Sequence, residues 1–332
     1  MNRLSHIILW LGAALLASCS ADWEPEAQPS ELQAIQLTAQ GLSAMEQTRA
    51  ASTADLQNTA FAGGEDVAVY LVDQASSSTY ATTPYRFRAA AAVGGHNDLT
   101  YYSDATTAST LYYPVTASAS VNIYGFYPYS RFSFIDNHST TNLSVAVNPN
   151  QSTITGYRNS DVMMATAITG QARTSSAVGL TFRHLMAKLV IRLKQGVHSG
   201  TTSIVNNSYL NEASLTIGNV ITHATLDMTT GTVTTGSNSV DVIVATSADL
   251  AFYYDNSGTA IGTTEYAIVL PPQALTGKTI TINPFANGTI TGTLPELTLT
   301  AGSSTILTLT VNDSGIEATR TNYSSGGSTT WN

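Results

Sequence analysis

Residues 121–127, with the sequence Val-Asn-Ile-Tyr-Gly-Phe-Tyr, constrain the fold of this chain more than any other segment. Successive side chains of a β-strand point to opposite faces of the sheet, and here both sets are largely apolar or aromatic. This pattern is typical of a strand that is covered on both faces. Pro128 cannot donate a hydrogen bond to a ladder, so the strand is expected to end near Tyr127. We therefore predict a central strand of a β-sandwich here.

The rest of the chain is composed of short apolar segments with turn residues between them. Only 11% of its 332 residues are charged, and Gly (24) and Tyr (16) are frequent, which favours a β-rich exported protein. The length favours two domains, and the regular spacing of the segments favours antiparallel sandwiches. We place the boundary at the polar residues 194–202, which gives domains at residues 50–195 and 196–332. The one helical segment is expected at residues 183–188.

The N-terminus predicts the compartment. Residues 1–18 contain a short basic start and an apolar run that is too short to span a bilayer, as in a signal peptide. The run ends in Leu-Ala-Ser before Cys19, the only cysteine of the chain, and this pattern resembles a bacterial lipobox. We therefore expect lipidation of Cys19, attachment to the outer membrane through that lipid, and no disulfide within the subunit. Residues 20–31 are acidic and proline-containing, as in a tether.

A possible first strand follows the tether at residues 32–39, where Ile35 and Leu37 form the best apolar pair on one face. Beyond it the chain becomes polar and rich in small residues. Arg49 stands there as an isolated basic residue, which is the kind of site that proteases cut. Residues 19–49 are thus predicted to form a lipidated tether with an N-terminal strand.

No pattern of residues indicates catalysis, a cofactor or a metal. None of the six histidines pairs with another at metal-ligand spacing, and neither a nucleophile elbow nor a phosphate loop is present. Asp66 and Asp161 are interpreted as turn acids, and His184 as a buried core histidine beside Phe182. The net charge of −9 and the absence of a basic patch exclude nucleic acid as a partner. We predict that the protein is not an enzyme.

Sugar binding is the main alternative among binding functions. No tryptophan lies in the segments expected to fold, so an aromatic platform for a sugar would have to be built from tyrosines. The two adjacent pairs, Tyr101-Tyr102 and Tyr253-Tyr254, are candidates. Tyrosines in strands more often pack across the sheet, so both readings stay open.

The order of motifs resembles the fimbrillin-like family, which contains pilins and pilus-associated lipoproteins of Bacteroides-type bacteria. The resemblance begins with the lipobox at Cys19 and with Arg49 in Thr-Arg-Ala. It continues through FAGGEDVAVY, VNIYGFYPYS, NSDVMMA and LTFRHLMAKLVIRL, and through ATLDMTTGTV, YAIVLPPQALTGKTITI and AGSSTILTLTVNDSGIEAT in the second half. The inserted acid in Gly-Glu-Asp at residues 64–66 departs from the family pattern. Each motif is weak alone, but their common order is specific.

The resemblance implies two transthyretin-like sandwiches in tandem and a structural role in a surface fimbria that supports adhesion. It also implies an assembly mechanism. An arginine-specific protease cuts between Arg49 and Ala50 and removes the N-terminal strand, and a strand from another pilin subunit fills the groove. Residues 315–332 are the candidate donor strand, with these apolar groups: Ile316, Ala318, Tyr323 and Trp331.

Several alternatives stay open at this point. Residues 315–332 are equally compatible with a closing strand and tail that stay in their own domain. A tail that does not donate fits a tip subunit, and a chain left uncut at Arg49 fits an anchor that keeps its lipid. The competing function is a monomeric surface lipoprotein that binds host or dietary glycans.

Overall fold

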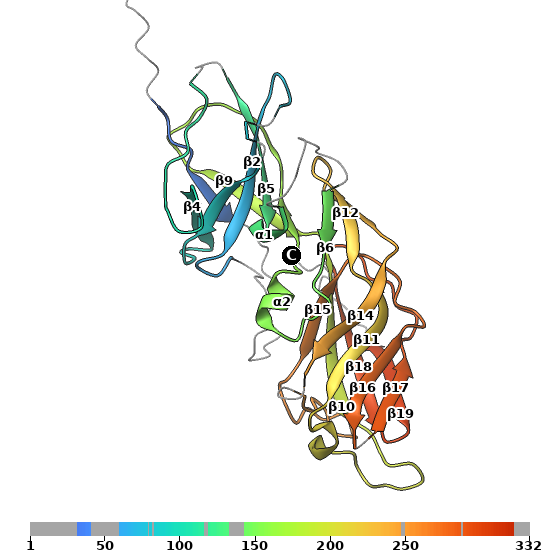
Figure 1. Ribbon diagram of the computed structural model, residues 1–332. Helices are drawn as coiled ribbons and strands as arrows, with labels where there is room; N and C mark the ends of the chain where they lie inside the picture. Colours follow the sequence, from blue (N-terminus) through green and yellow to red (C-terminus); the bar gives the residue numbers. More distant parts are fainter. Residues whose placement is uncertain are drawn as a thin grey trace, which may run out of the picture.

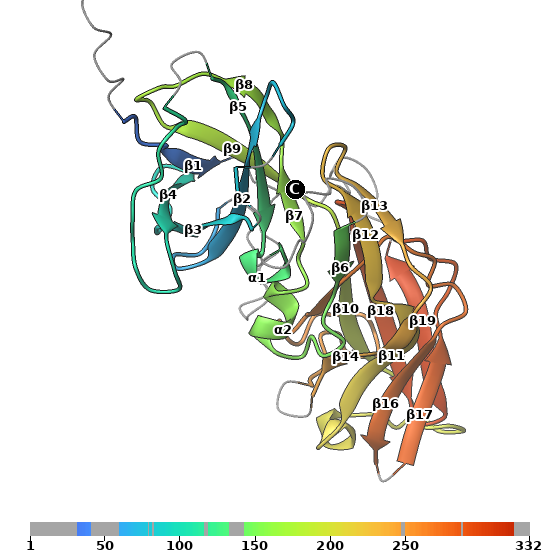
Figure 2. The ribbon, with the colours of Figure 1, turned by 45° about the horizontal axis from the view of Figure 1, so that its top comes forward.

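The computed structural model describes residues 32–40, 60–78, 80–81, 83–115, 119–132, 143–246, 250–286 and 288–321. These residues form two β-rich bodies that lie end to end (Figures 1 and 2). Helices are short: α1 (Tyr129–Phe132), α2 (Ile154–Arg158) and the 3₁₀ turn η1 (Asn207–Leu210). No helix in this described part of the chain has the length and apolar character needed to cross a membrane. The prediction of an all-β fold is confirmed at this level.

The first body is a ring of strands. Its hydrogen-bonded order is β2-β3-β4-β1-β9-β7-β5, and β5 also pairs with β2, which closes the ring; β8 is attached to β5. The strands are β1 (Leu37–Gln40), β2 (Asp66–Asp73), β3 (Tyr85–Ala89), β4 (His96–Tyr102), β5 (Val121–Tyr127), β7 (Met163–Ala165), β8 (Ile168–Gln171) and β9 (Val178–His184).

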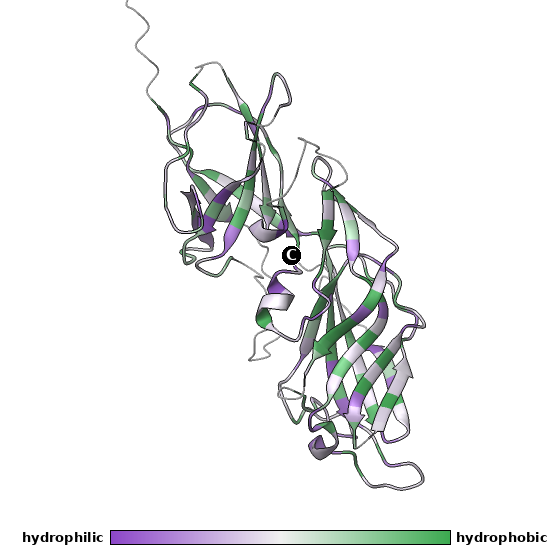
Figure 3. Ribbon diagram, in the orientation of Figure 1, coloured by the Kyte–Doolittle hydropathy of each residue, from purple (hydrophilic) through white to green (hydrophobic). Residues whose placement is uncertain are grey.

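The second body is also barrel-like. Its strand order is β14-β11-β16-β17-β19-β18-β10-β15, and the edge strands β14 and β15 lie against each other. A three-stranded sheet, β13-β12-β6, packs with it. The strands are β6 (Leu143–Ala146), β10 (Ala187–Gln195), β11 (Ser214–Ile221), β12 (His223–Asp227), β13 (Thr232–Thr235), β14 (Ser239–Ala245), β15 (Tyr266–Leu270), β16 (Thr279–Phe285), β17 (Gly288–Thr293), β18 (Ser304–Asn312) and β19 (Gly315–Thr321). Apolar and polar residues alternate along several of these strands (Figure 3).

Strand β5 has the two covered faces that its sequence predicts. Val121 and Ile123 are fully buried in the core of the first barrel. On the opposite face, Phe126 belongs to the large core of the second body, together with Ala68 and Tyr70 of the neighbouring strand β2. The outer faces of β2 and β5 therefore join the two bodies, which explains why neither face of β5 is polar.

Two expectations for the middle of the chain are wrong. Residues 183–188 do not form a helix: β9 ends at His184, and β10 starts at Ala187. Strand β10 pairs with β15 and β18 of the second sheet, so the chain changes sheets at residues 185–186 and not at the polar break of residues 194–202. The apolar pattern of β10 predicts a strand correctly, but it carries no information about which strand becomes its partner.

Candidate functional site

Strand β1 occupies a slot in the first barrel and is hydrogen-bonded along both of its edges. It runs antiparallel to β4, with Leu37 opposite Leu99, and parallel to β9, with Leu37 opposite Val178. The pairing extends before the strand itself, because Ile35 N donates to the Leu111 carbonyl at 2.8 Å. Residues 34–40 thus form the candidate functional site together with the slot that holds them (Figure 2).

The side chains of this segment alternate strictly between core and solvent. Ile35, Leu37 and Ala39 are 6%, 2% and 3% exposed and belong to the core of the first barrel, whereas Gln36 and Gln40 are exposed. This is the period of two that a half-buried strand requires. Burial of a Leu or Ile side chain stabilises a fold by about 1.5–3 kcal/mol each. The expected pairing of Ile35 and Leu37 on one face is confirmed.

Within the described residues, the ring is closed between β4 and β9 by β1 alone. Removal of β1 would leave the facing edges of β4 and β9 with unpaired N–H and C=O groups, which is a template for another strand. It would also uncover apolar walls made by Leu99, Val178 and Leu180. Sequence reasoning identified the strand but not these walls, because strand partners far apart along the chain leave no local signal.

The C-terminal strand β19 is built into the second barrel. It pairs antiparallel with β18 over seven positions and parallel with β17 at Gly292 and Thr293. Ile316 is 6% exposed, and a Cβ on Gly292 would lie 2.2 Å from the Ile316 carbonyl oxygen, so the two backbones are in close contact. Ile316 and Ala318 therefore lie in a closing strand of their own barrel here, which is the alternative to a donor strand that the sequence leaves open.

The remaining predicted site residues lie outside the described residues. These are the lipidation site Cys19, the processing site Arg49 and Ala50, and the two aromatic residues of the candidate donor, Tyr323 and Trp331.

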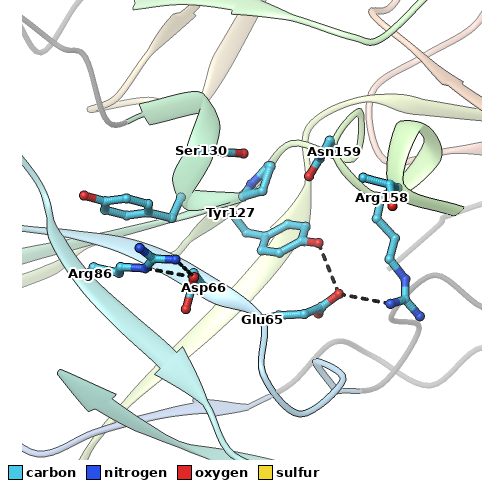
Figure 4. Close-up of a pocket in the computed structure, with 10 residues that line it drawn as sticks. Glu65, Asp66, Arg86, Tyr127, Ser130, Arg158 and Asn159 are labelled. Atoms are coloured by element: carbon cyan, nitrogen blue, oxygen red, sulfur yellow. Dashed lines mark hydrogen bonds and ion pairs between the residues drawn. The ribbon is translucent and has the colours of Figure 1, made fainter. Parts of the chain in front are cut away.

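Asp66, interpreted as a turn acid, begins β2 and binds two arginines of β3. Its carboxylate accepts from Arg88 Nε at 2.8 Å. It also accepts from Arg86, as Figure 4 shows. Burial alone would raise the pKa of Asp66, but the hydrogen bonds from Arg88 and Arg86 hold it below its usual range. The neighbouring Glu65 shows the opposite balance, because burial raises its pKa more than Arg158 and Tyr127 lower it. Asp66 therefore acts as a structural ion-pair partner.

Asp161, also interpreted as a turn acid, directly follows a turn, but its side chain is fully buried. His184 Nδ1 lies 2.8 Å from Asp161 Oδ1, and both side chains have an exposed fraction of 0%. The pair sits where β9 ends, and Leu185 N donates to the Val162 carbonyl at 2.9 Å. The expectation of a buried histidine is confirmed. The pair holds in place the segment where the chain passes from the first sheet to the second.

No metal centre accompanies these groups: in the described ranges, no three His, Cys, Asp or Glu side chains gather as metal ligands. The candidate pair Tyr253-Tyr254 packs within the second barrel, with ring centroids 4.6 Å apart and Arg192 over the Tyr253 ring. Tyr101 and Tyr102 instead border a surface hollow of the first barrel.

Known proteins similar to this chain are fimbrial and adhesion proteins. The chain is 24% identical to "Putative fimbrium subunit Fim1C" of Bacteroides uniformis over 326 residues, which are 96% of this chain and 93% of that protein. Its fold resembles the crystal structure of a "putative cell adhesion protein" from Bacteroides uniformis, with a TM-score of 0.59, 19% identity, and 87% and 96% of the two chains covered. It also resembles the crystal structure of a protein of the same description from Bacteroides ovatus. The TM-score is 0.60, the sequence identity is 16%, and 88% of this chain and 96% of that chain are covered.

The two crystal structures support the fold alone, because their sequence identities are low. The family assignment has a separate basis, since the model of the family described as fimbrillin-like matches residues 48–329 of this chain. That range includes nearly all of both barrels, and the relationship suggested by the order of the sequence motifs is confirmed. This chain belongs to the fimbrillin-like family.

Proposed function

We propose that this protein is a structural subunit of a cell-surface fimbria, and that its first barrel receives a strand from another subunit. The observation that carries the proposal is the position of β1, which alone joins β4 to β9 among the described strands. Its segment is short, apolar on one face and hydrogen-bonded on both edges. A strand in such a slot can be replaced by another strand of the same pattern, because the ladder and the side-chain pockets stay in place.

The proposal includes export and processing. The precursor reaches the outer membrane as a lipoprotein on Cys19, and cleavage between Arg49 and Ala50 separates β1 from the rest of the chain. Family membership supports a structural role rather than catalysis, and the similarity to a fimbrium subunit supports a place on the cell surface. The description of both bodies as transthyretin-like also remains a proposal.

The proposed donor segment is shorter than residues 315–332. Residues 315–321 form β19, so any donor function of this chain rests on residues 322–332. Those residues contain Tyr323 and Trp331 but no apolar alternation like that of Ile35, Leu37 and Ala39. A mismatch of this kind favours the tip of a fibre over its stalk, because a tip subunit receives a strand without donating one.

The test is limited digestion of the chain from Ser20 onward with an arginine-specific protease, followed by N-terminal sequencing and a non-boiled gel. We expect a cut that leaves Ala50 as the new N-terminus. Because β1 is held by two ladders, the cut fragment should stay bound until a competing strand displaces it. A labelled peptide of residues 32–40 supplies that competing strand, and fluorescence polarisation measures its uptake by the cut protein.

Two controls make the result specific. An Arg49→Lys chain should resist the protease, and a peptide with Leu37→Asp should not enter the slot, because it would place a charge in an apolar pocket. Folded protein that resists cutting at Arg49, or cut protein that takes up both peptides equally, would contradict the strand-exchange proposal.

A further inference from the structure

Two hollows lie side by side at the end of the first barrel where β3, β4 and α1 meet, and α2 borders one of them. One measures about 260 Å³ and is bordered by Tyr85, Tyr101, Tyr102 and Asp104. The other measures about 230 Å³ and is bordered by Glu65, Tyr127 and Arg158 (Figure 4). Arg86 and Tyr129 line both hollows. Each is smaller than the roughly 300–1,000 Å³ of a site for a drug-sized ligand, so each suits one ring-sized group.

The aromatic rings around the first hollow are held in place by their neighbours. Tyr85 and Tyr101 meet edge to face with ring centroids 5.9 Å apart, and Tyr101 also packs on Phe87 at 5.7 Å. Arg88 lies 4.4 Å over the Tyr102 ring, and Arg86 lies 5.1 Å over that of Tyr129. All four tyrosines are half-buried. They therefore form a preorganised aromatic wall whose rings need little ordering when a ligand binds.

Their hydroxyl groups remain available to a ligand. Within the described residues, the hydroxyls of Tyr85, Tyr101 and Tyr129 make no hydrogen bond to the protein, whereas Tyr70 and Tyr266 use theirs on the Phe132 carbonyl and the Ala251 N–H. Burial also raises the pKa of Tyr85, so its hydroxyl stays protonated and both donates and accepts. Half-buried rings with unused hydroxyls combine an apolar surface with polar groups at its rim.

The charges around the two hollows balance. Arg86 and Arg88 both bind Asp66, Arg158 lies 3.8 Å from Glu65, and Asp104 accepts hydrogen bonds within its own turn. A polyanion or a polycation gains no net attraction from such a surface. A neutral ligand with many hydroxyls uses the fixed donors and acceptors as they are.

We propose that these two hollows form a binding site for a neutral oligosaccharide. One sugar ring stacks against the tyrosines of the first hollow, and the next ring lies beyond the Arg86–Tyr129 pair in the second hollow. The apolar faces of the rings pack on the aromatic side chains, while their hydroxyls bond to the tyrosine hydroxyls and to the charged rim. The site shares strand β4 with the slot of β1, but no residue of β1 lines either hollow, so the proposal does not depend on the proposed assembly mechanism.

The test is saturation-transfer NMR on the chain from Ser20 onward with four neutral disaccharides: maltose, cellobiose, lactose and N-acetyllactosamine. We expect at least one to bind with a Kd of about 1 mM, which is the affinity of a small set of stacking and hydrogen-bonding contacts. A triple variant, Tyr85→Phe with Tyr101→Phe and Tyr129→Phe, keeps the rings and removes the hydroxyls. Its affinity should fall at least about tenfold, which corresponds to 1.4 kcal/mol.

A matched control comes from the second barrel. Tyr253→Phe removes the hydroxyl of a tyrosine that lies beside an arginine but does not line either of the two proposed hollows, and it should leave sugar binding unchanged. Thermal unfolding shows whether the triple variant is folded, and Tyr102→Ala provides a second variant, which removes one ring of the aromatic wall and should also weaken sugar binding. An acidic disaccharide from heparin serves as a charged fifth probe. No binding by any of the four neutral sugars, equal binding by the parent and the triple variant, or binding confined to the acidic probe would each overturn the proposal.

Discussion

The two barrels of this protein are completed in different ways. In the first, the closing strand is β1, which is separated from its neighbours β4 and β9 by long stretches of chain. In the second, the last strand β19 follows β18 in a hairpin and reaches β17 through close backbone contact at Gly292. Both strands bury an apolar face, with Leu37 at 2% and Ile316 at 6% exposure.

The difference shows that burial alone does not make a strand exchangeable. Strand β19 is tied to its partner by a two-residue turn, so leaving the barrel would break a local hairpin as well as two ladders. Strand β1 has no such local partner, and only residues 41–59 connect it to the next described segment. A cut in that connection removes the covalent constraint without touching any described hydrogen bond. Replacement is therefore favoured at the first barrel.

The largest expected effect comes from shortening the chain at each of these strands. Truncation after Asn312 removes β19 and should prevent the second barrel from folding, because seven paired positions and the buried Ile316 are lost. Deletion of residues 20–40 should leave a first barrel that folds again when a peptide of residues 32–40 is added. Circular dichroism and thermal melts with and without peptide measure both outcomes. If the peptide does not refold the chain that lacks residues 20–40, the first barrel is no more able to accept a replacement strand than the second.

The next effect concerns the connection between the barrels. Asp161→Ala removes the hydrogen bond between Asp161 and the fully buried His184, and leaving a buried polar group unsatisfied costs about 1–3 kcal/mol, more where the group is charged. Because the pair lies where the chain changes sheets, both barrels should lose stability together in urea unfolding. The double variant Asp161→Ala with His184→Phe should recover part of the loss. Separate transitions for the two barrels in the single variant would show that the pair does not couple them.

An effect of smaller extent, on one strand of one barrel, is expected from Leu37→Ala in β1. Truncation of a buried leucine costs about 2–5 kcal/mol, and here the cost falls on the docking of one strand. Hydrogen exchange should therefore accelerate at the edges of β4 and β9 and stay unchanged in β18 and β19. Thr38→Ala is the matched control, because its side chain points away from the core. Equal acceleration in both barrels would contradict the independent docking of β1.

The smallest effect is a dependence on pH that belongs to the first barrel. The pKa of Asp66 is lowered in the folded protein, so its contribution to stability is present above the ordinary value of 3.8 and is lost as pH falls through the folded pKa. Asp66→Asn should lower stability at neutral pH and reduce the loss below about pH 4. Thermal unfolding between about pH 2 and pH 7 measures this.

Glu65→Gln tests a dependence of stability on pH that has the opposite sign. Because its pKa is raised, the stabilising contribution of Glu65 is present below 4.5 and is lost as pH rises through the folded pKa. The glutamine variant should therefore be no less stable than the parent at neutral pH. A parallel response of the two variants would show that the ion pairs, rather than the two acids separately, set the acid sensitivity.

Much of the fold follows from local patterns in the sequence. The two apolar faces of residues 121–127 predict a strand with two covered faces, and Phe126 and Ile123 do lie in separate cores. The alternation at Ile35 and Leu37 likewise predicts β1. Partner choice is different, because residues 187–195 would form the same strand in either sheet. Their place beside β18 depends on contacts more than 100 positions away along the chain.

The candidate sites show the same limit. His184 could be predicted as buried from its apolar neighbours, but its partner Asp161 follows a turn and has the sequence context of a surface acid. Tyr101 and Tyr102 could be recognised as a possible sugar platform. The hollow beside them depends on Tyr85 and Tyr129, which come from β3 and α1 and reach the same place only in the folded barrel.

The slot of β1 also has a mechanical consequence. Its ladders run along both edges of the strand, and ladder hydrogen bonds lie across the strand direction. Tension along the axis of a seated strand loads all of these bonds in shear at once, whereas peeling from one end breaks them one by one. A fibre whose pull follows the strand axis is held by the full set of bonds, and removal from an end remains the easier route for exchange.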